Sequence, residues 1–95
     1  MDNKVKAKEE MITLFEEVID YIYNHNNRWY HNWYRPSDDY TLSDNGTYLM
    51  FEIYVSNDKW DGNDWTETWY INNDGSIKTK NEEYENIEEF KRLWQ

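Results

Sequence analysis

The sequence predicts an α+β domain in which an antiparallel sheet of three to four strands packs against a long N-terminal helix and a short C-terminal helix. Three observations predict this class. Apolar residues recur at helical spacing near both ends of the chain and alternate at strand spacing in the middle, and the late connections are short enough for hairpins. A chain of 95 residues has room for one compact domain, residues 1–95.

Residues 5–23 are expected to form the long helix. Their apolar side chains recur every three or four positions, at Ala7, Met11, Leu14, Phe15, Val18, Ile19 and Ile22. Most acidic side chains of the segment fall elsewhere on the helical wheel. Asp2 or Asn3 can cap the start, and the polar residues 24–27 can end the helix. This pattern predicts that one side of the helix lies against the sheet.

Two strands are expected in the middle of the chain. The aromatic stretch 29–34 suits a short strand that ends at Pro36, because proline removes a backbone donor. Residues 47–55 alternate strictly, so one face of this strand is expected to be core. That face carries Leu49, Phe51, Ile53 and Val55.

The last part of the chain predicts a hairpin and a helix. Residues 65–72 alternate again, and the following Asn-Asp-Gly sequence tolerates positive φ, so residues 76–80 should pair back. Residues 87–94 place Ile87, Phe90 and either Leu93 or Trp94 at helical spacing. Asn86 precedes Glu89 by three residues, which resembles a capping box.

Catalytic and metal-binding side chains are scarce. Cysteine is absent, which removes thiolate nucleophiles and the common structural zinc sites. His25 and His31 are six residues apart, which does not match a helical pair of metal ligands. The acidic loops around Gly62 and Gly75 lack oxygen ligands in the register of an EF-hand. We therefore expect no catalytic residue, no metal site and no cofactor, and a chain that is not an enzyme.

The charge of the chain is strongly negative and uneven. The formal net charge is −10, and residues 37–76 alone carry nine acidic residues and one lysine. Such a field repels nucleic acid and anionic membranes, and it speeds encounter with a basic protein surface. We therefore expect a basic nucleic-acid-binding protein as partner, with no direct binding to nucleic acid or membrane. The chain has no apolar run of membrane-spanning length and no signal-peptide pattern, which predicts a cytoplasmic protein.

Aromatic side chains are interleaved with the acidic residues of this segment. Trp and Tyr surrounded by polar groups dominate the binding energy of many protein interfaces. A thin sheet with helices on one face cannot bury both faces of its strands, so some of these rings should be exposed. We expect the partner-binding site to consist of Tyr54, Asp58, Trp60, Asp61, Asp64, Trp65 and Glu67.

A short, acidic, cysteine-free α+β chain with Asp58, Asp61, Asp64 and Glu67 in a loop and hairpin resembles the small phage-encoded inhibitors of bacterial defence, including anti-CRISPR proteins and DNA mimics. The resemblance implies stoichiometric inhibition of a defence nuclease or CRISPR effector, by acidic mimicry or occlusion, in the cytoplasm of a bacterial host. An immunity protein that neutralises a cognate toxin makes nearly the same demands on sequence. A carbohydrate-binding module is a third reading, because Trp, Tyr, Asn and Asp also line sugar-binding faces.

Overall fold

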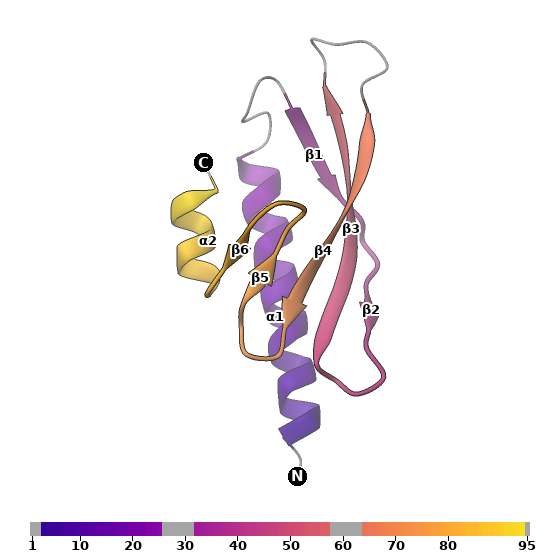
Figure 1. Cartoon of the computed structure of the whole chain (residues 1–95), viewed down its shortest axis with the longest axis vertical. Helices are drawn as coiled ribbons and strands as arrows, with labels where there is room; N and C mark the ends of the chain where they lie inside the picture. Colours follow the sequence, from indigo (N-terminus) through magenta and orange to yellow (C-terminus); the bar gives the residue numbers. More distant parts are fainter. Residues whose placement is uncertain (1–2, 26–31, 58–63, 95) are drawn as a thin grey trace.

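The computed structural model describes residues 3–25, 32–57 and 64–94 of the chain. It confirms the α+β class: along the chain, a long helix comes first, the strands of an antiparallel sheet follow, and a short helix comes last (Figure 1). The elements are α1 (Asn3–Asn24), β1 (Asn32–Pro36), β2 (Thr41–Leu42), β3 (Tyr48–Asn57), β4 (Trp65–Asn72), β5 (Ile77–Lys78), β6 (Glu83–Tyr84) and α2 (Ile87–Leu93).

The sheet has six strands, more than the three to four that the sequence predicts. The β3–β4 hairpin is its centre, and β5 and β6 follow beyond β4. β1 and β2 pair in succession with the other edge of β3, β1 beside residues 53–57 and β2 beside residues 49–50. β5 lies within the segment 76–80 and pairs with β4, as predicted. The additional strands are β2 and β6, each two residues long and too short to produce an alternating pattern.

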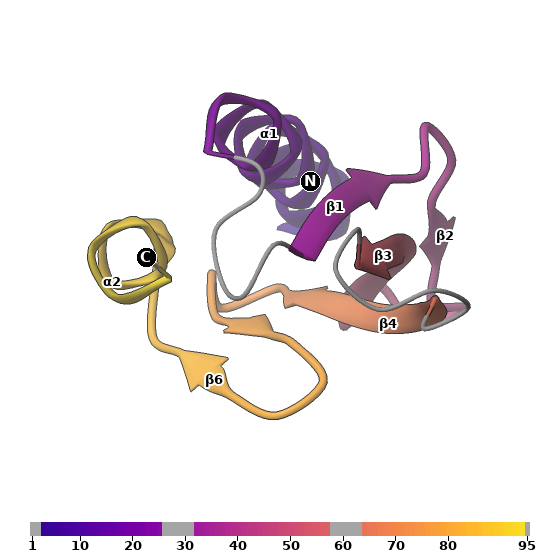
Figure 2. The ribbon, with the colours of Figure 1, turned by 90° about the horizontal axis from the view of Figure 1, so that it is seen from above.

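α1 covers one face of the sheet (Figure 2). Its buried stripe follows the predicted helical spacing and consists of Met11, Phe15, Val18 and Ile22. These side chains meet the buried face of β3, for example where the rings of Phe15 and Phe51 contact edge to face with centroids 4.9 Å apart. Each fully buried apolar side chain contributes about 1.5–3 kcal/mol to folding. Among the described residues, no helix is long and apolar enough to cross a membrane.

α2 is held by a cap at its start and an aromatic ring at its centre. Asn86 Oδ1 accepts a hydrogen bond from the Glu89 N–H at 2.9 Å, which confirms the predicted N-cap. Glu89 Oε1 accepts from the Glu85 N–H, one residue earlier than a capping box requires. Phe90 is fully buried, and Trp94 is buried where Leu93 is exposed, which decides between the two predicted core positions.

The β4–β5 turn follows the prediction from its Asn-Asp-Gly sequence. Gly75 has φ of +91°, and its N–H donates to the Asn72 carbonyl. The Asn72 N–H in turn donates to the Ser76 carbonyl, so Asn72 and Ser76 close the turn. Glycine adopts this left-handed conformation without a steric penalty, which is why the chain can reverse here.

Candidate functional site

The face of the sheet opposite α1 carries no helix in the described part of the chain (Figure 2), and we term it the open face. Three of the described residues are exposed aromatic side chains on it: Trp33 (40% exposed), Tyr48 (37%) and Tyr54 (39%). Register places them on one face with the polar or half-buried residues Arg35, Met50, Glu52, Thr66, Thr68, Tyr70 and Lys78. Exposed Trp and Tyr of this kind are typical anchors of protein interfaces.

Tyr54 lies between a cation and a carboxylate on the open face. The guanidinium carbon of Arg35 is 5.1 Å from the centroid of the Tyr54 ring, and the Tyr54 hydroxyl donates to Asp64 Oδ2 at 3.0 Å. This hydrogen bond, with the negative charge of Asp64, raises the pKa of Tyr54. Because both ends of the ring are held, the side chain loses little conformational freedom when a partner packs on it.

Trp65 and Glu67 belong to the other face of the sheet. Glu67 is only 9% exposed and accepts hydrogen bonds from two indoles: Trp65 Nε1 donates to Oε2 at 2.7 Å, and Trp69 Nε1 donates to Oε1 at 2.9 Å. The predicted site residues are therefore divided between faces. Tyr54 and Asp64 lie together on the open face, while Trp65 and Glu67 lie on the face that α1 covers.

Three of the predicted site residues, Asp58, Trp60 and Asp61, lie outside the described residues. The other exposed carboxylates of the segment 37–76 are spread over different places. Asp38 and Asp39 lie between β1 and β2, Asp44 lies in the β2–β3 turn and Asp74 in the β4–β5 turn. Among the described residues, the open face combines three acidic side chains, Glu52, Asp64 and Glu83, with two basic ones, Arg35 and Lys78.

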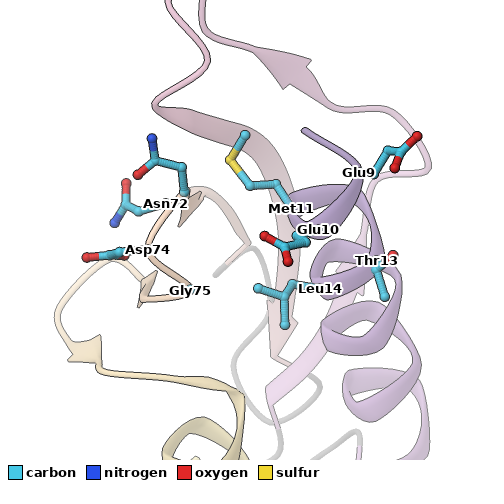
Figure 3. A pocket seen from close by; sticks show the side chains of 9 residues that line it. Glu9, Glu10, Met11, Thr13, Leu14, Asn72, Asp74 and Gly75 are labelled. Atoms are coloured by element: carbon cyan, nitrogen blue, oxygen red, sulfur yellow. The ribbon is translucent and has the colours of Figure 1, made fainter. Parts of the chain in front are cut away.

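A cavity of about 620 Å³ lies between α1 and the β4–β5 turn. Figure 3 shows Glu10, Met11 and Leu14 projecting from α1 toward the turn, whereas Glu9 and Thr13 point the other way. Asp74 at its rim already accepts hydrogen bonds from the hydroxyl and the N–H of Ser76, and these bonds lower the pKa of Asp74. Asp74 therefore stabilises the turn. The cavity is an open groove with apolar walls.

The described part of the chain contains no group of three or more His, Asp or Glu side chains arranged to hold a metal ion. Sequence reasoning missed Trp33, Arg35, Tyr48 and Glu52 as members of an exposed aromatic face. Part of the signal was available, because Tyr48, Glu52 and Tyr54 share one parity of a strand whose other parity is apolar. The contribution of Trp33 and Arg35 depends on the β1–β3 register, which alternation within a single strand does not specify.

The chain was compared with protein-family models, with curated proteins and with solved structures, and no match was found in any of the three comparisons.

Proposed function

We propose that this chain is a stoichiometric inhibitor that binds the basic, nucleic-acid-binding surface of a bacterial defence nuclease or CRISPR effector. It acts by occlusion and performs no chemistry of its own. The observation that carries the proposal is the open face, where Trp33, Tyr48 and Tyr54 are exposed on a rigid sheet beside carboxylates. A domain whose described residues leave several aromatic rings exposed on one sheet face has a surface suited to a protein partner.

Charge and anchoring have separate roles in this proposal. The net charge of −10 attracts a basic surface and speeds encounter with it. The rings of the open face then supply the apolar contact area, with Asp64 and Glu52 at hand for basic side chains of the target. Occlusion is favoured over close imitation of a phosphate backbone, because the described acids are spread around the molecule and Arg35 and Lys78 lie among those of the open face.

The test is an inhibition assay on a panel of purified CRISPR effector nucleases, restriction endonucleases and toxin nuclease domains, each with its DNA or RNA substrate. We expect inhibition of a defence nuclease that reaches completion near one inhibitor per enzyme. Inhibition should weaken as salt is raised and when competing nucleic acid is added first, because both screen or occupy the basic surface.

A double variant, Tyr54→Ala with Asp64→Lys, should weaken inhibition by more than about tenfold, because it removes an anchor and reverses a charge on the open face. The matched control is Tyr23→Ala with Asp20→Lys, which makes the same chemical changes on exposed positions of α1. Equal loss in both variants would mean that the open face has no special role and that overall charge alone decides binding.

The same panel of enzymes distinguishes this proposal from the alternative function, an immunity protein. Inhibition confined to a toxin nuclease domain, and unchanged at high salt, would identify the chain as an immunity protein. A chain that inhibits none of these enzymes at equimolar or excess concentration would overturn both functions.

A further inference from the structure

The carboxylate of Glu67 is buried, and the described residues provide no cationic partner for it. Its two oxygens accept hydrogen bonds from the indoles of Trp65 and Trp69, and none of the described lysines, arginines or histidines forms an ion pair with it. A carboxylate has about four lone-pair sites, so the indoles leave part of its capacity unused. Buried charges in proteins are normally paired, because the cost of removing them from water is high.

Glu67 also lines a cavity of about 230 Å³, which we term the Glu67 cavity. Its walls include the rings of Tyr34, Trp69 and Trp94, and the residues of the β5–β6 turn form another side, Thr79, Lys80, Asn81 and Glu82. An engineered cavity of about 150 Å³ already holds a benzene molecule, so there is room here for the end of one side chain. The cavity thus joins a carboxylate to aromatic walls, which attract cations through their ring faces.

We propose that the Glu67 cavity receives one arginine side chain of the protein partner. The guanidinium is planar, is weakly hydrated and stacks on aromatic rings, so it suits a site of this composition better than a compact ammonium does. Arginine is abundant on nucleic-acid-binding surfaces, which the proposed function assigns to the partner. The inference rests on the proposed function only in naming the partner protein as the source of the arginine.

Lys80 is the internal competitor for this site. It lines the cavity, and its Nζ lies 5.8 Å from the centroid of the Trp65 ring, the same ring that donates to Glu67. A cation is therefore already held beside the indole, at a distance typical of a cation–π contact. An arginine entering the cavity would displace or adjoin this exposed lysine side chain.

The test uses the ¹⁵N-labelled chain of 95 residues, observed by NMR, with Nα-acetyl-arginine N-methylamide as the probe. The indole N–H resonances of Trp65 and Trp69 report directly on the hydrogen bonds to Glu67. We expect both resonances to shift saturably with the arginine probe. The equivalent citrulline probe has the same shape without the charge, and it should bind at least about tenfold more weakly.

Variants locate the effect. Glu67→Gln should weaken binding of the arginine probe by at least about tenfold, whereas Glu16→Gln, the same change at an exposed position of α1, should leave it unaltered. Lys80→Gln should tighten binding, because it removes the competitor. The citrulline comparison on the unchanged chain and the Lys80→Gln variant keep the test decisive even if Glu67→Gln does not fold.

Equal responses to the arginine and citrulline probes, or equal losses in Glu67→Gln and Glu16→Gln, would overturn the inference. So would the absence of any saturable shift in the two indole resonances. None of these results decides the proposed function, because nuclease inhibition is measured separately and depends on variants of the open face.

Discussion

At the residue scale, Tyr84 shows how burial and a hydrogen bond combine. Its side chain is buried, and its hydroxyl donates to Glu82 Oε1. Burial is the larger cause, and the hydrogen bond to the Glu82 carboxylate the second, of a pKa of Tyr84 that lies far above its ordinary value. The protonated phenol is therefore the form that the folded chain requires.

A raised tyrosine pKa stabilises the fold below the ordinary tyrosine pKa of about 10, and the stabilisation is lost as the pH rises toward the folded-state pKa. We expect the free energy of unfolding, measured by urea titration, to fall between neutral pH and about pH 11. Tyr84→Phe should flatten this decrease, and it should cost about 1 kcal/mol at neutral pH through loss of the bond to Glu82. Tyr23→Phe, at an exposed position, is the control, and an equal effect there would contradict the assignment.

At the element scale, the two helices differ in what holds them. α1 has 22 residues and a buried stripe of its own, whereas α2 has seven residues and depends on its cap and on Phe90. The two are also linked directly, since Lys91 Nζ is 2.8 Å from Glu17 Oε2 and the Tyr21 hydroxyl donates to the Lys91 carbonyl. The Glu17 carboxylate raises the pKa of Lys91, mainly through this hydrogen bond.

Asn86→Ala should destabilise the protein by about 1 kcal/mol, because a helix of seven residues loses the acceptor for one of its first N–H groups. Asn86→Asp keeps that acceptor and should be close to neutral. Urea unfolding followed by circular dichroism measures both changes. If Asn86→Ala and Asn86→Asp were equally stable, the cap would contribute nothing and α2 would be held by packing alone.

Periodicity explains which elements could be predicted. α1, β3, β4 and α2 each have three or more residues in a regular pattern, and their predicted bounds lie within two residues of the observed ones. β5 has two residues and was predicted from the turn before it, because residues 76–80 had to pair back. β2 and β6, also of two residues each, have no such signal, so they depend on their neighbours and not on a local pattern. The predicted first strand, 29–34, overlaps β1, which runs from Asn32 to Pro36, and residues 29–31 lie outside the described residues.

The candidate site was predicted less completely than the fold, for the same reason. Tyr54, Asp64 and Glu67 are close in sequence, and closeness suggested a single site. Alternation along β4 puts Glu67 on the same buried face as Trp69. A carboxylate at a position that alternation assigns to the core could have indicated that Glu67 has a different role from the exposed acids. The Glu67 cavity also needs Tyr34, Trp94 and the β5–β6 turn, segments that only tertiary structure brings together.

At the scale of the whole molecule, like charges dominate. The chain has 20 acidic and 10 basic side chains, so the folded state brings negative charges closer than the unfolded chain does. We expect the midpoint of thermal unfolding to rise as NaCl is increased from low concentration to about 0.15 M, where the Debye length is about 8 Å. A fall over that range would indicate that ion pairs such as Lys91 with Glu17 outweigh the repulsion.

The edges of the sheet have a consequence for self-assembly. One edge is β6, only two residues long, and the other is divided between β1 and β2, with Pro36, which has no N–H, at the end of β1. Long unpaired strand edges are templates on which copies of a chain join into fibrils, and short or proline-containing edges block such growth. The chain can therefore keep aromatic rings exposed on a β-sheet at high concentration without polymerising through its backbone.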